Sequence, residues 1–240
     1  MTDSRPIVTQ LQVGQRIDVE DVGRLTLLTV TQRNWSRVGI AGTGEQRFFV
    51  KQFVDRVGKP HLKGFEGDRQ TYEKLPAVLT DDIRVVPVSG YDDALLLTVF
   101  PYLEMSTLDS IGRVRPHHAA IARRIGEALA AILDNRCLPD DPGKVSVWKG
   151  LDPKNIGWAP DGTLWVFDFG PSTVVDVQTA ASRALAAGLL SRWLARPGRH
   201  ILRPERTILR GVCEPLVPYT TLESVEEVLR AQERLRLREP

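Results

Sequence analysis

The sequence has little cysteine and no long apolar run. Only two of its 240 residues are cysteines, Cys137 and Cys213, which is too few for a disulfide framework and favours a reducing compartment. No apolar stretch approaches the roughly 20 residues that a membrane-spanning helix needs. Residues 1–6 lack the basic start and apolar run of a signal peptide. We therefore expect a cytoplasmic protein that does not enter a membrane.

A strong excess of charge of either sign is also missing. Lysine and arginine number 32 and aspartate and glutamate 30, so the formal net charge is +2. This balance predicts no general attraction to nucleic acids or membrane surfaces. The hydrophobic share of 42% and the charged share of 26% are usual for a globular chain and argue against disorder, collagen-like repeats and a coiled coil. The length allows one large domain or two small lobes.

The first hundred residues have mainly the pattern of β-strands. Runs rich in strand-forming residues lie at 25–30, 38–40, 47–53, 85–88 and 94–100. A helix is predicted between the third and fourth runs, because several residues there are spaced to share one helical face. These residues are Phe65, Asp68, Tyr72 and Leu75. The sequence thus predicts five strands with one helix inserted after the third.

The remainder is predicted to be mainly helical. Pro116 suits a first helical position, and an apolar stripe follows it. Further helices are predicted over 180–195 and from Thr220, where Glu223 three residues on would complete a capping box. One hairpin is expected among these helices, over 156–167, around a Pro-Asp-Gly turn.

Three polar features carry candidate chemistry. Lys51 lies in a hydrophobic strand, a polar loop over 151–156 leads into the hairpin, and Asp168 begins an Asp-Phe-Gly tripeptide at its end. Because a tight turn brings the outer ends of two strands together, Asn155 and Asp168 should converge. Amide and carboxylate oxygens that converge at an open site suit Mg²⁺, which keeps waters and binds phosphate oxygens. The alternatives are a surface hairpin with capped ends and a solvent-exposed or edge lysine.

Taken in order, these segments resemble the protein-kinase-like superfamily, and more closely its small bacterial branch of aminoglycoside-phosphotransferase-like kinases. Residues 48–51 resemble the family's third-strand lysine segment, and residues 99–108 resemble the hinge that contacts adenine. Residues 151–156 resemble the end of the catalytic loop, and residues 168–170 the metal-binding motif. The thirteen residues from Asn155 to Asp168 are also typical of the family.

The resemblance, over roughly residues 24–195, implies an α+β, two-lobed protein-kinase-like fold. Residues 1–100 would form an N-terminal lobe, a five-stranded antiparallel sheet with one helix that covers the nucleotide. Residues 101–240 would form a mainly helical C-terminal lobe with the hinge, the catalytic loop and the metal site.

The resemblance also implies that ATP and Mg²⁺ bind in the cleft between the lobes. Lys51 would hold the α- and β-phosphates. Asp68 is the best match for the acidic residue that orients the lysine, with Glu66 and Glu73 as alternatives.

The remaining implied site residues bind the base and the metal. In the hinge, which includes Tyr102, Leu103 would offer backbone hydrogen bonds to adenine, and Phe100 would line the back of the pocket. Asn155 and Asp168 would hold Mg²⁺ on the phosphates.

Two departures from the family pattern bear on catalysis. The family's catalytic aspartate lies five residues before the metal-binding asparagine, and that position here is Gly150. Asp152, two residues further on, is the candidate substitute for the missing base, although it could equally cap the loop. Loss of a general base costs about 10²–10⁴ in rate. The loop over 31–37, which would cover the nucleotide, contains no glycine.

The implied function is that of an ATP-dependent phosphotransferase, a kinase that acts on a hydroxyl group of a small molecule, a peptide or a protein. The short C-terminal part leaves little room for substrate-binding insertions, which favours a peptide or protein acceptor and a pathway with a partner enzyme. The alternative is a pseudokinase that binds nucleotide as a scaffold or regulatory subunit. Gly150 favours the pseudokinase, whereas Lys51, Asn155 and Asp168 favour the enzyme.

Overall fold

The computed structural model describes residues 8–107, 123–124, 126–127, 130, 144–147, 155–169, 173–176, 210–211, 213–217, 221–224 and 227, with the backbone alone for 144–147 and 173–176. The chain divides into two compact units. The first comprises 1–73 with 86–104, and the second 74–85 with 105–240. The predicted lobes, 1–100 and 101–240, stay a prediction.

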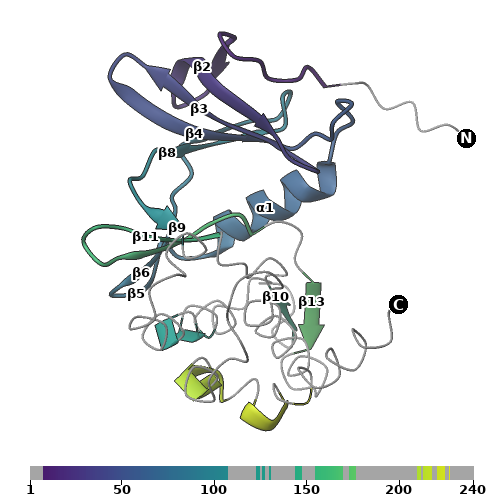
Figure 1. Cartoon of the computed structure of the whole chain (residues 1–240). Coiled ribbons are helices and arrows are strands. Elements are labelled where there is room, and N and C mark those ends of the chain that lie inside the picture. Colours follow the sequence, from purple (N-terminus) through teal and green to yellow (C-terminus); the bar gives the residue numbers. More distant parts are fainter. Residues whose placement is uncertain are drawn as a thin grey trace, which may run out of the picture. The chain divides into compact units, whose positions relative to one another are not determined.

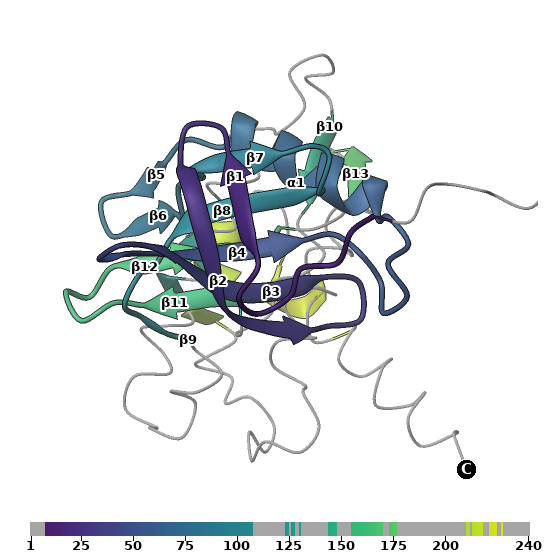
Figure 2. The ribbon, with the colours of Figure 1, turned by 90° about the horizontal axis from the view of Figure 1, so that it is seen from above.

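The first unit contains a six-stranded antiparallel sheet in the order β1-β2-β3-β4-β8-β7 (Figures 1 and 2). Its strands are β1 (Arg16–Val19), β2 (Gly23–Gln32), β3 (Arg37–Thr43), β4 (Gln46–Gln52), β7 (Gly90–Asp92) and β8 (Leu97–Pro101). The prediction of five strands is therefore wrong by one. The edge strands β1 and β7 are too short for their alternation to be recognised in the sequence.

One predicted strand belongs elsewhere. The run at 85–88 lies mostly outside any strand, and β6 (Ile83–Val85), which overlaps it, belongs to the sheet of the second unit. Pro87 has no amide hydrogen to donate to a ladder, which suits the irregular backbone there. The predicted run at 94–100 begins as a strand only at Leu97, because Leu96 turns the chain with a φ of 50°.

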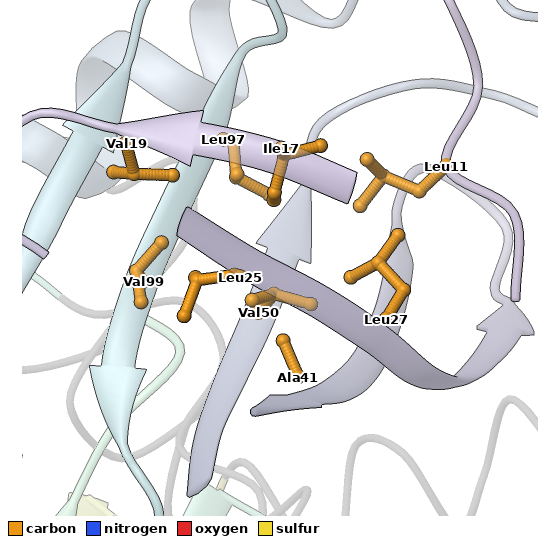
Figure 3. Close-up of a cluster of buried hydrophobic side chains, with 9 residues drawn as sticks. All are labelled: Leu11, Ile17, Val19, Leu25, Leu27, Ala41, Val50, Leu97 and Val99. Carbon is orange, nitrogen blue, oxygen red and sulfur yellow. The ribbon is translucent and has the colours of Figure 1, made fainter. Parts of the chain in front are cut away.

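The six-stranded sheet curls around an apolar core (Figures 2 and 3). Nine buried side chains form this core: Leu11, Ile17, Val19, Leu25, Leu27, Ala41, Val50, Leu97 and Val99. A Cβ atom at Gly90 in β7 would lie 2.8 Å from the carbonyl oxygen of Glu20, so the curl requires a glycine there. Because side chains alternate along a strand, Val50 and Val99 face this core, while Lys51 and Phe100 face the other side of the sheet.

The helix α1 (Leu62–Lys74) covers that other side. The Phe65 ring lies 5.7 Å from the Phe53 ring, and the Tyr72 ring 5.3 Å from the Phe100 ring, between centroids. The predicted helix and its buried face are therefore confirmed.

The second unit contains a five-stranded sheet in the order β5-β6-β12-β11-β9. Its remaining strands are β5 (Val78–Thr80), β9 (Ser106–Thr107), β11 (Ile156–Trp158) and β12 (Leu164–Val166). Only the β6–β12 pair is parallel. The predicted hairpin is confirmed as β11 and β12, but the sheet that surrounds it was not predicted. Separately, β10 (Lys144–Val147) pairs antiparallel with β13 (Thr173–Asp176).

Few helical residues of the second unit are described. They include residues 123–124, the 3₁₀ helix η3 (Glu214–Leu216) and residues 222–224. The N–H of Ser224 donates to Oγ1 of Thr221, so the capping residue is Thr221 and the predicted capping box at Thr220 is wrong by one position. The predicted helices at Pro116 and over 180–195 lie outside the described residues. No helix of the described part is long and apolar enough to cross a membrane.

Candidate functional site

Lys51 and Asp68 form a buried ion pair within the first unit. The Lys51 Nζ atom lies 3.4 Å from Oδ1 of Asp68, and the two side chains are 8% and 0% exposed. Glu66 is exposed, and the exposed Glu73 pairs with Arg69 at 2.9 Å. Of the three candidate carboxylates on α1, the one that Lys51 contacts is therefore that of Asp68, the residue on the apolar face.

Sheet register and helix periodicity place this pair. Lys51 lies opposite Val38 of β3 and Thr98 of β8, which fixes its side chain on the face that α1 covers. Its ammonium group also lies 4.3 Å from the centroid of the Phe53 ring, an attractive cation–π arrangement. Because desolvation offsets most of the attraction in a buried ion pair, such a pair adds little net stability and is a candidate functional group.

The end of β8 holds the predicted hinge. Phe100 is buried opposite Phe49, with ring centroids 6.2 Å apart. The backbone N–H of Tyr102 donates to the carbonyl of Arg47 at 3.2 Å, and the Tyr102 side chain is exposed. The sheet thus uses the Tyr102 amide, and Leu103 remains the candidate donor to a base.

Asn155 and Asp168 meet at the outer ends of β11 and β12 in the second unit. The side-chain amide of Asn155 donates to the backbone carbonyl of Asp168 at 3.3 Å, and the N–H of Phe167 donates to the carbonyl of Asn155 at 3.1 Å. Ile156 pairs with Val166, so the hairpin register brings the two residues together as expected.

The backbone of Asp168 is strained. Its φ of 59° lies in the left-handed region, which glycine adopts freely and which residues with a side chain usually avoid. The neighbouring Phe169 is buried at 1% exposure and anchors the chain at this point. Strain of this kind at a polar residue points to a functional position.

The donors at this position fit magnesium. The Asn155 amide oxygen and the Asp168 carboxylate are hard oxygen donors, and Mg²⁺ completes its shell with waters and phosphate oxygens. Among the residues that the structure describes, no three His, Cys, Asp or Glu side chains cluster as a metal site would need. Amide and carboxylate oxygens suit magnesium better than zinc, which favours Cys and His ligands.

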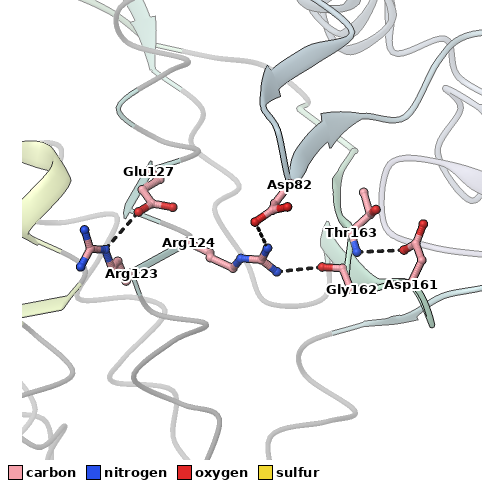
Figure 4. A network of polar contacts seen from close by, with 7 residues as sticks. All are labelled: Asp82, Arg123, Arg124, Glu127, Asp161, Gly162 and Thr163. Carbon is pink, nitrogen blue, oxygen red and sulfur yellow. Dashed lines mark hydrogen bonds and ion pairs between the residues drawn. The ribbon is translucent and has the colours of Figure 1, made fainter.

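A polar network fixes the turn of the same hairpin (Figure 4). Arg124 donates to the carbonyl of Gly162 at 2.7 Å and pairs with Asp82, which precedes β6. In the turn, the Asp161 carboxylate accepts the N–H of Thr163 at 2.9 Å, a bond that lowers the pKa of Asp161. Arg124 is not predictable from the sequence, because no local pattern marks an arginine that binds a turn 38 residues away.

Solved protein kinase domains resemble the chain over most of its length. The kinase domain of PknI from Mycobacterium tuberculosis matches with a TM-score of 0.52 and 12% identity, over 93% of this chain and 100% of that domain. A double mutant of that domain matches with a TM-score of 0.55 and 13% identity, over 93% and 100%. The chain has a protein-kinase-like fold. At these identities the likeness shows the fold alone.

No protein-family model matches the chain, and no curated protein matches it either. The structural matches reported above are to a protein kinase domain and lend no support to the narrower resemblance to aminoglycoside-phosphotransferase-like kinases. That resemblance stays a prediction.

Other predicted positions in this kinase-like fold are not described. The predicted catalytic positions Gly150 and Asp152 lie outside the described residues.

Cys213 is buried, and burial together with Glu223 raises the pKa of its thiol to about 11. It is therefore a poor candidate for a nucleophile.

Proposed function

We propose that the chain is an ATP-dependent phosphotransferase that moves the γ-phosphoryl group of ATP to a hydroxyl group. The buried Lys51–Asp68 pair carries this proposal. Such a pair adds little to stability, whereas a strand lysine oriented by a helix carboxylate is what phosphate binding in a kinase requires.

Different residues of the chain would bind the phosphates, the base and the magnesium ion. Lys51 would hold the α- and β-phosphates, and Asp68 would keep the ammonium group in place. Phe100 would contact the base, and the backbone of Leu103 would bind its polar edge. Asn155 and Asp168 would hold Mg²⁺, which when bound neutralises charge on the phosphate oxygens.

Asp152 would act as the general base in place of Gly150. It would take the proton of the acceptor hydroxyl as the hydroxyl oxygen bonds to the γ-phosphorus. The bond from that phosphorus to the bridging oxygen breaks, and ADP leaves with the electron pair. We propose a peptide or protein acceptor, which a partner enzyme could modify further.

A pseudokinase is the second candidate, because Gly150 stands where the family has its catalytic aspartate. It would bind Mg-ATP and transfer nothing. Both candidate functions therefore include nucleotide binding, and a measurement of phosphoryl transfer distinguishes the kinase from the pseudokinase.

Thermal melting with Mg-ATP tests the shared step, because a bound ligand raises the melting temperature by mass action. Asp168→Asn should reduce the rise far more than the matched loss of charge at Glu45→Gln, an exposed turn residue. A flat titration into the millimolar range would contradict both candidates.

Labelled ATP with candidate acceptors then tests transfer, and Asp152→Asn should slow it about 10²–10⁴-fold with little change in nucleotide affinity. An Asp152→Asn variant with unchanged turnover would remove Asp152 from the mechanism.

A further inference from the structure

The loop between β2 and β3 has a defined shape although it contains no glycine. Within the loop the N–H of Arg33 donates to the carbonyl of Ser36 at 2.8 Å. The side-chain amide of Gln32 donates to the carbonyls of both residues, at 2.6 and 3.2 Å. These bonds tie the two ends of the loop together and fix where its tip lies.

Trp35 at this tip contacts the start of α1. Its side chain is 63% exposed, yet its ring lies 5.5 Å from the imidazole of His61, between centroids, at an interplanar angle of 32°. His61 is itself fixed, because its N–H donates to the carbonyl of Phe53 and its own carbonyl accepts the N–H groups of Gly64 and Phe65. The ring contact therefore attaches the loop to the first turn of α1.

Gly64 provides the space in which the imidazole lies. A Cβ atom at this position would lie 2.2 Å from Nδ1 of His61, closer than atoms approach in proteins. Glycine is otherwise a poor choice inside a helix. An alanine at position 64 would therefore displace the His61 ring.

The attachment lies beside Lys51. The loop leads into β3, where Val38 pairs with Lys51 of β4. Phe53 connects His61 with Lys51, because its carbonyl accepts the N–H of His61 and its ring centroid lies 4.3 Å from the Lys51 ammonium group. Burial and, to a smaller extent, the charge of Lys51 lower the pKa of His61. The loop, His61 and Lys51 gather at one end of the sheet.

We propose that Trp35 and His61 form a latch that fastens the β2–β3 loop to α1 beside Lys51 and slows the release of nucleotide phosphates bound there. Trp35 and His61 are then positioning residues, which act through the loop and through the helix that carries Asp68. A loop held in place before binding loses less conformational entropy when a ligand arrives. The effect on nucleotide release rests on the proposed nucleotide binding. The attachment of the loop to α1 does not, and hydrogen exchange measures it in the absence of nucleotide.

Hydrogen exchange on the nucleotide-free protein reports the latch itself. We expect Trp35→Ala and Gly64→Ala to speed amide exchange in the loop over 33–36, and Trp35→Phe to behave like the wild type. Val57→Ala, which shortens a similarly exposed apolar residue of the same unit, is the matched control and should change nothing in the loop. Unchanged exchange in both Trp35→Ala and Gly64→Ala would overturn the latch.

Dissociation of a fluorescent ATP analogue, chased with unlabelled Mg-ATP, reports the function of the latch. Trp35→Ala and Gly64→Ala should each raise the dissociation rate about threefold to tenfold, as the loss of one aromatic contact predicts. Trp35→Phe should restore the slow rate. Gly64→Ala is the decisive variant. Alanine has a higher helix propensity than glycine, so a variant that acted only by stabilising α1 would not raise the dissociation rate.

The two readouts separate the possible failures. Faster exchange in the variants with unchanged dissociation would overturn the effect on nucleotide release. Absence of nucleotide binding in the wild type would overturn the proposed function and this effect with it.

Discussion

The two candidate pairs, Lys51 with Asp68 and Asn155 with Asp168, are held by different means. In the first unit, two opposite charges are buried between a strand and a helix. In the second unit, a neutral amide bonds to a backbone carbonyl, and the acidic residue that owns this carbonyl is strained. Both pairs cost free energy, the first through desolvation and the second through backbone conformation.

This difference matters for mutagenesis. Loss of one member of a buried charge pair removes a compensating charge from beside the other member. Loss of the Asp168 side chain can instead relieve the cost, provided that the new residue accepts a left-handed backbone. Replacement of Asp68 by an apolar residue should therefore destabilise the protein, whereas the effect of a substitution at Asp168 should depend on whether the new residue accepts a left-handed backbone.

The largest effect is expected at Asp68. Asp68→Leu removes the carboxylate that lies 3.4 Å from the buried Lys51 ammonium group and should lower the free energy of unfolding by about 3–5 kcal/mol. Adding Lys51→Met should recover most of that loss, because no charge of the pair then remains buried and Met is similar in size to Lys. Urea denaturation measures both variants, and the double variant should not respond to Mg-ATP.

The comparison between the two pairs fails if the single variant Asp68→Leu is only slightly destabilised. If Asp68→Leu costs less than about 1 kcal/mol, the value of an exposed pair, the charges are not desolvated as the buried geometry implies. Glu66→Leu on the exposed side of the same helix is the control and should change stability by less than about 0.5 kcal/mol.

A smaller effect, set by the backbone conformation, is expected at Asp168. Asp168→Gly should be more stable than Asp168→Ala by about 1 kcal/mol, because glycine adopts a φ of 59° without strain and alanine does not. Both variants remove the carboxylate and should lose the stabilisation by Mg-ATP. Thermal melting with and without Mg-ATP measures both quantities, and equal stability of the two variants would show that the backbone there relaxes.

Helical periodicity and hairpin geometry made the two pairs predictable. The spacing of Phe65 and Tyr72 put Asp68 on the buried face of α1 and left Glu66 outside. The turn around Gly162, which has a φ of 89°, set the register that joins Asn155 to the following strand. The hairpin pair needed only local pattern, whereas the pairing of Lys51 with an acidic residue of this helix was implied by the resemblance to kinases.

Long-range contacts between short elements were not predictable in this way. The parallel pairing of β6 with β12 joins two three-residue strands that lie about 80 residues apart, and so few residues give no alternation to recognise. The bond from Arg124 to Gly162 and the stacking of Trp35 on His61 depend on how distant segments fold back. A sequence pattern also does not reveal that Asp168 takes a left-handed backbone, since glycine is the usual residue there.

The smallest effect concerns His61 and the charge of Lys51. Burial first, and then Lys51, lower the pKa of His61 from 6.5 in the folded protein. The unfolded chain therefore binds this proton more readily. Stability from the neutral imidazole is full above the unfolded pKa and declines as pH falls from 6.5 toward the folded pKa.

His61→Gln should remove this decline, so its melting temperature should fall less than that of the wild type between about pH 7.5 and about pH 5.5. The same comparison in the Lys51→Met, Asp68→Leu background should show a smaller but nonzero difference. Removing the ammonium group eliminates only the lesser cause of the lowered pKa and leaves the burial. An undiminished difference in that background would show that Lys51 does not act on His61, and would separate the imidazole electrostatically from the buried pair.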